Sequence, residues 1–216
     1  MGLTIHYNFK TRKKTENLLK TLESVRQKCL DLPFKEVSKV THKIYTKRDI
    51  EYFNSLFYDP CSSISFEQRD RELEKKGLDR ESLFSIMWSE AFRKDPQKDI
   101  DYEVINFWVW AGTGCEGTSV SCIREHNPKK SFECRGFTKT QFAENFVRSH
   151  LLVIKFLDLL VEHGIKVEVH DEGYFWETRD LKFLADNINA YTNLIQDIGL
   201  TLKKEILDKE DTNVTI

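Results

Sequence analysis

Hydrophobic and polar residues alternate with a period of two in several segments of the chain, and with a helical period in others. A period of two indicates a half-buried strand, whereas apolar residues three and four positions apart indicate an amphipathic helix. Strands are therefore expected over residues 3–8, 37–45, 102–110, 118–124, 131–137 and 165–170. Helices are expected from residue 15 until Pro33, over 143–163, and over 181–207.

Residues 48–98 interrupt this pattern. The segment is rich in charge, contains a short apolar helix candidate over 82–92, and has no strand signal of its own. A piece of about 50 residues can hardly bury enough surface to be stable alone. We therefore expect a helical insertion at about 48–98 within a single domain that spans residues 1–216.

The order of these elements indicates the fold class. A strand, a helix and a strand precede the insertion, and three consecutive strands follow it before a helix, a strand and a last helix. A run of neighbouring strands between helices is typical of an α+β protein. The prediction is a mainly antiparallel sheet of about six strands, with helices packed on one face.

Charge and composition narrow the range of partners and the compartment. The 216 residues carry 33 Lys and Arg against 35 Asp and Glu, a formal net charge of −2, which argues against nucleic-acid binding. No run approaches the ~20 apolar residues of a membrane span, and the first residues do not resemble a secretory signal. Five cysteines, with no Cys-x-x-Cys pair, fit reduced thiols. We expect a cytoplasmic protein without a membrane partner.

The segment Gly112–Gly117 matches the spacing G-x-G-x-x-G directly after a strong strand. That pattern binds a dinucleotide only if a helix begins there and offers its free N–H groups. A β-branched run follows instead, so the segment is predicted to be a hairpin turn, with Cys115 and Glu116 at its tip.

The segment Thr138–Ala143 lies between an expected strand and the long helix. Lys139 together with free backbone donors at the start of a helix could hold an anion. The alternative is that Thr138 or Thr140 caps the helix and that Lys139 is solvated.

A third segment, residues 170–180, holds four carboxylates, one imidazole and three aromatic side chains at the end of a strand. His170 beside carboxylates could bind a divalent metal or act in acid–base chemistry. The structural alternative is a turn in which an Asp or a Glu caps the last helix. His150 lies on the apolar stripe of the long helix. It is expected to be a buried, hydrogen-bonded residue of the core, or alternatively to meet this third segment.

These segments together resemble a family of mostly bacterial, cytosolic proteins of unknown function. Its members share an Ile-His-Tyr strand, a Gly-Cys-Glu turn, a Thr-Lys-Thr-Gln-[Phe/Tyr]-Ala segment, a helix with a His, and a Val-His-Asp-Glu-Gly-Gly-Tyr-Trp-Glu-Thr segment. The matching residues here are Ile5–Tyr7, Gly114–Glu116, Thr138–Ala143, His150 and Val169–Thr178. The chain departs from the pattern at Tyr174, where a second glycine is usual, and in a longer region 48–98.

The resemblance implies that polar residues from three separated segments converge in one cleft. The residues expected to be catalytic are His170, Glu172 and Glu177. The residues expected to bind a ligand are Glu116, Lys139, Gln141, His150 and Asp171.

Two classes of function follow from these observations. The first is a small-ligand-binding or hydrolase-like protein with a polar Glu/His/Lys site, with or without a divalent metal ion. The second is a non-catalytic interaction module, such as an adaptor or an immunity-type inhibitor, that uses the charged insertion as its surface. A homodimer through that same surface is a third alternative, and the sequence leaves open whether the protein is an enzyme.

Overall fold

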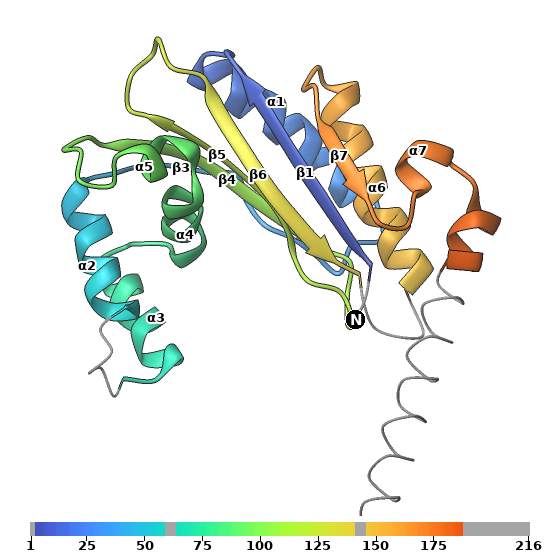
Figure 1. The fold of residues 1–216 in the computed structure, drawn as a ribbon, viewed down its shortest axis with the longest axis horizontal. Helices are drawn as coiled ribbons and strands as arrows, with labels where there is room; N and C mark the ends of the chain where they lie inside the picture. The colour runs from blue at the N-terminus through green and yellow to red at the C-terminus, as the bar shows by residue number, and fades with distance from the viewer. Residues whose placement is uncertain (1–2, 59–63, 141–145, 188–216) are drawn as a thin grey trace, which may run out of the picture.

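The computed structural model describes residues 3–58, 64–140 and 146–187 (Figure 1). The elements before and within the insertion are β1 (Thr4–Thr11), α1 (Thr15–Leu30), β2 (Glu36–Val37), β3 (Thr41–Tyr45), α2 (Lys47–Phe57), α3 (Phe66–Lys75), α4 (Arg80–Trp88) and α5 (Glu90–Lys94). They are followed by β4 (Tyr102–Trp110), β5 (Thr118–Glu125), β6 (Phe132–Lys139), α6 (Phe146–Glu162), β7 (Glu168–Asp171) and α7 (Phe175–Thr178). Residues 181–187 are also helical.

The strands form one antiparallel sheet in the order β2-β4-β5-β6-β1-β7, and β3 also pairs with β4. The hairpins β4–β5 and β5–β6 connect neighbouring strands, whereas β1 is inserted between β6 and β7 from far away in the sequence. The N-terminal strand therefore lies next to the last strand, and residues separated by more than 160 positions face each other.

One face of the sheet, which we call the helix face, is covered by α1 and α6 (Figure 1). Alternate residues of the central strands point into this core, because successive side chains of a strand point to opposite faces. Phe107 and Phe156 meet there edge to face, with their ring centroids 5.6 Å apart. The core residues of β1 are Ile5, Tyr7 and Phe9, and those of α1 include Leu18, Leu22 and Val25.

The opposite face, which we call the open face, is covered only in part. Helices α2, α3 and α4 lie at one side of the sheet and build a second hydrophobic core (Figure 1). Phe53 stacks on Phe57 at 4.6 Å and meets Phe84 edge to face at 4.9 Å. Tyr102 and Val104 extend this core from β4. The outer half of the open face, over β6, β1 and β7, carries exposed side chains instead.

The α+β class, the antiparallel sheet, the helices on one face and the helical insertion predicted from the sequence are all confirmed. Several strand boundaries were wrong. β1 continues to Thr11 and β6 to Lys139, beyond the predicted ends at residues 8 and 137. The expected strand over 37–45 is divided into β2 and β3, because residues 38–40 leave the regular ladder and Ser38 binds the backbone of Trp108 through its own amide and hydroxyl groups. The expected strand over 165–170 pairs only over Glu168–Asp171.

The last expected helix begins at residue 181, as predicted, and its part beyond residue 187 lies outside the described residues, as does the expected start of the long helix at residue 143. In the portion of the chain that the structure describes, no helix combines the length and the apolar character that crossing a bilayer requires.

Candidate functional site

The register of β6, β1 and β7 arranges the exposed side chains of the open face in rows. Phe137, His6 and His170 form one row, since His6 is opposite both of the other residues. Arg135, Asn8 and Glu168 form the next row in the same way. Directly opposed residues on one face of an antiparallel pair have Cβ atoms about 4.5–5.5 Å apart. Each row is therefore a set of neighbouring side chains contributed by segments far apart in the sequence.

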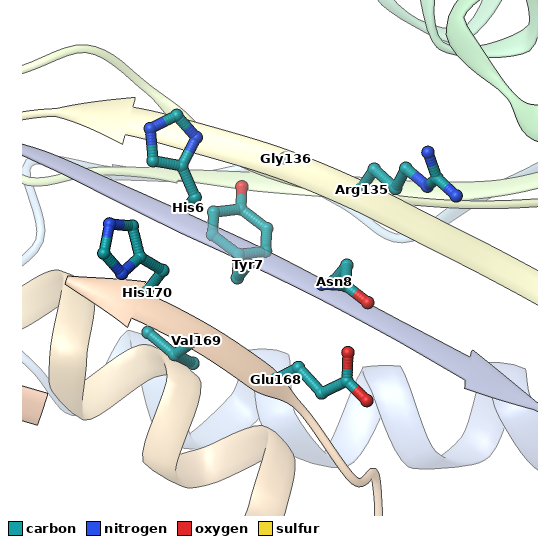
Figure 2. Close-up of a pocket in the computed structure, with 8 residues that line it drawn as sticks. All are labelled: His6, Tyr7, Asn8, Arg135, Gly136, Glu168, Val169 and His170. Carbon is teal, nitrogen blue, oxygen red and sulfur yellow. The ribbon is translucent and has the colours of Figure 1, made fainter. Parts of the chain in front are cut away.

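These rows border a hollow of about 380 Å³, which we call the open-face groove. It is lined by His6, Tyr7, Asn8, Arg135, Gly136, Glu168, Val169 and His170. Figure 2 shows the two imidazole rings side by side at one end, with Arg135 and Glu168 on the outer strands toward the other end. The rings of His6 and His170 lie 6.3 Å apart between centroids, at an angle of 24°. The groove thus combines a cation, an anion, an amide and two imidazoles.

The floor of the groove depends on a contact between Tyr7 and Gly136. These residues are directly opposed, and the Tyr7 ring lies on the helix face under the Gly136 backbone. A Cβ atom on Gly136 would lie 2.4 Å from Cζ of Tyr7, closer than real contacts allow. The Tyr7 hydroxyl then donates to the Ser119 carbonyl oxygen at 2.6 Å, and burial raises its pKa well above the usual value. Tyr7 is accordingly a structural residue, whose side chain extends beneath β6 to the backbone of β5.

The end of the groove near the insertion is bordered by α5. Glu90 of this helix accepts from Lys10 at 2.8 Å and from Arg135 at 3.2 Å, and it pairs with Lys94 at 2.8 Å. Hydrogen bonds and charge from the two lysines lower the pKa of Glu90 from 4.5 to about 2. Glu133 is buried below and accepts from the first two amides of α5, at 2.7 and 3.2 Å. These contacts hold α5 against the sheet and orient Arg135.

The other end of the groove rests on a buried hydrogen-bonded chain beneath β7. Asp171 follows His170 and points to the helix face, where its Oδ2 lies 3.1 Å from Nε2 of His150. Nδ1 of His150 lies 3.1 Å from Oγ1 of Thr140. All three side chains are completely buried. This chain joins α6, β7 and the segment that follows β6, so it fixes where the strand that carries His170 ends.

The carboxylate of Asp171 is satisfied on both oxygens. Oδ1 accepts from the Gly173 amide at 2.8 Å, and Oδ2 accepts from the Trp176 amide at 3.0 Å as well as from His150. Burial raises the pKa of Asp171, but the hydrogen bond and charge of His150 and the two amides outweigh it, so the pKa lies below the usual 3.8. Asp171 is therefore a buried carboxylate that organises the turn after β7.

Glu172 holds the same turn to β1. Its carboxylate accepts from the Thr4 amide at 2.7 Å, and its own amide donates to the Thr4 carbonyl oxygen at 3.1 Å. Glu172 thus continues the pairing of β7 with β1 by one residue beyond the strand. The position of His170 relative to His6 follows directly from this clamp and from Asp171.

The structure distributes the predicted site residues among several places. His150 and Asp171 meet, and so do Glu116 and Lys139. The Glu116 amide donates to the Lys139 carbonyl oxygen at 3.0 Å, and the Lys139 amide donates to the Glu116 carboxylate at 3.2 Å. Lys139 and His170 lie on the same face of the sheet, because their partners on β1 are Thr4 and His6.

The remaining predicted residues are placed as follows. His170 lines the open-face groove, Glu172 clamps β1, and Glu177 is exposed on α7. His150 and Asp171 are fully buried beneath the sheet, on the side opposite to His170. Gln141 lies outside the described residues. The segment Gly112–Gly117 connects β4 to β5, which confirms the predicted hairpin turn.

Sequence reasoning did not select His6, Asn8, Arg135 and Glu168 as site residues, although they line the groove. A signal was present, because these four residues occupy the polar positions of strands whose other positions are apolar. Alternation alone, however, assigns such residues to a solvated face. Only the pairing of β1 with β7 shows that His6 and His170 are neighbours.

A second polar cluster lies on the helix face, at the end of the sheet near α1. Glu103 is buried and accepts from Arg124 at 2.7 Å, from Thr15 at 2.8 Å and from His42 at 2.9 Å. Burial raises its pKa, but these partners outweigh it and the pKa of Glu103 lies below the usual 4.5. Arg124 also stacks on the Phe132 ring at 4.2 Å. This cluster secures the start of α1, where Thr15 is the first helical residue.

Comparison of the chain with protein-family models, curated proteins and solved structures finds no significant match. The geometry of the site is consequently the basis of the functional argument.

Proposed function

We propose that this chain is a small-ligand-binding protein whose binding site is the open-face groove. The observation that carries the proposal is the pair of exposed imidazoles, His6 and His170, directly opposed on β1 and β7 at the edge of a hollow of about 380 Å³. Small-molecule sites are concave and combine a hydrophobic or aromatic wall with a few convergent polar groups. Phe137, which is 54% exposed beside His6, supplies apolar surface next to those groups.

The polar groups of the groove favour a ligand that carries both a donor and an acceptor. Arg135 and Glu168 stand on the outer strands of one row, with Asn8 between them. A guanidinium binds a carboxylate or phosphate with paired hydrogen bonds, whereas a carboxylate binds an ammonium or hydroxyl group. His6 and His170 are the imidazoles of the groove that could exchange a proton with such a ligand, and hydrolytic chemistry stays a prediction for the same site.

The buried residues of the predicted site have a positioning role in this proposal. His150 and Asp171 are out of reach of solvent, and Glu172 is engaged with the backbone of Thr4. We propose that these three residues hold β7 against β1, so that the imidazoles of His6 and His170 remain opposed. Glu116 and Lys139 maintain the end of β6 in a similar way.

A titration followed by NMR tests this proposal. The full chain, kept in a chelator, is titrated with inorganic phosphate, acetate, glycine and adenosine monophosphate, and the amide and imidazole signals of His6 and His170 are monitored. We expect at least one probe to shift both histidines together with the neighbouring signals of Asn8. The Arg135→Ala variant should weaken that binding by about tenfold to a hundredfold, since a hydrogen bond to a charged group contributes about 1.5–3 kcal/mol.

Lys166→Ala is the matched control, because Lys166 is an exposed cation just before β7 that does not line the groove. Its affinity for the probe should equal that of the unmodified chain. The proposal is wrong if no probe moves the groove signals, or if Lys166→Ala and Arg135→Ala weaken binding equally.

A protein-interaction module remains the second candidate, and one observation favours it. Phe66 at the start of α3 is 63% exposed, and Trp88 at the end of α4 is 66% exposed. Exposed apolar side chains mark a contact surface between proteins where they form a continuous patch, and these two residues are candidates for such a patch on the insertion. We expect self-association through these helices, if it occurs, to be abolished in the Phe66→Ser and Trp88→Ser double variant. Sedimentation velocity over a range of concentrations measures this, and a chain that is monomeric throughout would argue against the homodimer.

A further inference from the structure

The six histidines of the chain fall into two groups by their contacts. Four have a partner: His42 and His126 approach the Glu103 carboxylate, His150 lies between Thr140 and Asp171, and His163 contacts the Leu159 carbonyl oxygen. The other two are His6 and His170. Within the part of the chain that the structure describes, neither of these two imidazoles has a hydrogen bond or an ion pair. Their nearest aromatic neighbours are each other and Phe137.

The two rings are also close to the separation that a shared metal ion requires. Nitrogen ligands lie about 2.0–2.1 Å from Zn²⁺, which places the centroids of two coordinating imidazoles about 5–6 Å apart. The centroids of His6 and His170 are 6.3 Å apart. The rings are stacked at 24°, so both exposed side chains have to rotate about their torsions to turn one nitrogen each toward a shared ion, while the strands stay in place.

The backbone beneath the rings holds them opposite each other. His6 and His170 are direct partners in the antiparallel ladder, and Glu172 and Asp171 secure the end of β7 immediately after His170. A site whose ligands stand on paired strands loses little conformational freedom on binding. Glu168, two residues before His170 on the same face, adds a negative charge on β7, while the positive charge of Arg135 across the groove is paired with Glu90.

We propose that His6 and His170 form a two-imidazole site for a late first-row divalent cation of the Zn²⁺, Ni²⁺ or Cu²⁺ type. Neutral imidazole nitrogen suits these ions, whereas Mg²⁺ and Ca²⁺ prefer oxygen ligands. Among the described residues, no three His, Cys, Asp or Glu side chains are placed to hold a metal together. The site therefore offers two protein ligands and leaves further coordination positions open to water or to an anionic ligand. This inference rests on the proposed function, because it names a metal ion as a ligand that the open-face groove binds.

The test uses Zn²⁺ alone with the chelator-treated full chain. Isothermal titration should show one Zn²⁺ bound per chain, and the imidazole signals of His6 and His170 should shift together in the NMR spectrum. We expect His6→Ala and His170→Ala each to weaken binding about tenfold or more, and a large excess of Mg²⁺ not to compete. His126→Ala is the matched control, because His126 is an equally accessible imidazole elsewhere, with 48% of its side chain exposed. Its affinity for Zn²⁺ should be unchanged.

Two results would overturn the inference: no Zn²⁺ binding by the unmodified chain, or binding that persists unchanged in the His6→Ala, His170→Ala double variant. Thermal unfolding of each variant, expected to match that of the unmodified chain, verifies that the exposed substitutions leave the fold intact. The failure of this inference is distinguishable from that of the proposed function. If the chelator-treated chain still binds one of the small-molecule probes in the groove, the metal site alone is wrong.

Discussion

Asp171 shows how a single buried carboxylate can organise a turn. Its two oxygens accept from Gly173, Trp176 and His150, so the turn after β7, the start of α7 and the interior of α6 all meet at one side chain. The other ring nitrogen of His150 is hydrogen-bonded to the Thr140 hydroxyl. Such a network stabilises a structure when every member is satisfied, and the loss of one member leaves another buried and unpaired.

We predict that Asp171 makes the protein sensitive to acid. Its pKa in the folded state lies below the usual value, so the stability that it contributes is present above about pH 4 and is lost as the pH falls through that lower pKa. Asp171→Asn should cost about 3 kcal/mol at neutral pH and should flatten the dependence of stability on pH below about pH 4. Urea unfolding between pH 3 and pH 7 measures both effects.

Glu177→Gln is the control for this experiment, since Glu177 is an exposed carboxylate six residues further along. Its unfolding curves should follow those of the unmodified chain at every pH. If Asp171→Asn retains the same loss of stability in acid as the unmodified chain, Asp171 is not the group responsible, and Glu103 and Glu90, whose pKa values are also lowered, become candidates.

Tyr174, in the turn between β7 and α7, has a backbone conformation that most residues avoid. Its φ is 57° and its ψ is 13°, in the left-handed region where a Cβ atom crowds the following carbonyl oxygen. The turn holds Tyr174 in this conformation, because the Asp171 carbonyl oxygen accepts from the Tyr174 amide at 2.9 Å and because Glu172, two residues earlier, is bound to Thr4.

A pair of substitutions isolates the backbone effect at this position. Tyr174→Ala and Tyr174→Gly lose the same contact of the ring with Phe183, but only glycine adopts a positive φ without strain. We expect Tyr174→Gly to be more stable than Tyr174→Ala by about 1 kcal/mol, measured by chemical denaturation. Equal stability of the two variants would show that the turn relaxes to another conformation.

At the scale of elements, β1 decides the site. It is inserted between β6 and β7 with eight and four paired residues respectively, and it supplies both His6 and Asn8 to the groove. The alternation of β1 places Ile5, Tyr7 and Phe9 in the core, so its polar residues necessarily face outward. Helix α5 ends the exposed part of this face, because Glu133 binds its first amides.

At the scale of the whole molecule, the sheet separates two hydrophobic cores. The core on the helix face joins α1 and α6 to the central strands, and the smaller core joins α2, α3 and α4 to one side of the sheet. Regions of a protein that open independently do so with lower free energy than global unfolding. The division into two cores suggests that the insertion can open while the core of the helix face stays folded.

Phe53→Ala tests this division. Phe53 is fully buried between Phe57 and Phe84, and its truncation should cost the surrounding structure about 3–5 kcal/mol. We expect hydrogen exchange, measured by mass spectrometry, to accelerate in α2 and α4 while α1 and α6 keep their protection. Phe156→Ala, a matched truncation in the other core, should have the opposite distribution. Uniform acceleration in both variants would mean that the two cores unfold together.

The sequence by itself determined the elements and the fold class, since strand and helix periods depend on local patterns that a single chain displays. It also indicated the hairpin at Gly112–Gly117, because a β-branched run after the glycines is incompatible with a helix. The boundaries that it missed, at residues 38–40 and at the start of β7, depend on backbone partners in other strands.

Only the tertiary structure decided which polar residues meet. His150 and Asp171 come together beneath the sheet, while His170, adjacent to Asp171 in the chain, points to the opposite face and meets His6. The physical reason is that a strand sends neighbouring side chains to opposite faces, whereas strand pairing unites residues remote in sequence. Polar residues that are neighbours in the sequence are thus sent to different faces of the sheet. A site forms where the register of paired strands brings polar side chains from remote segments together.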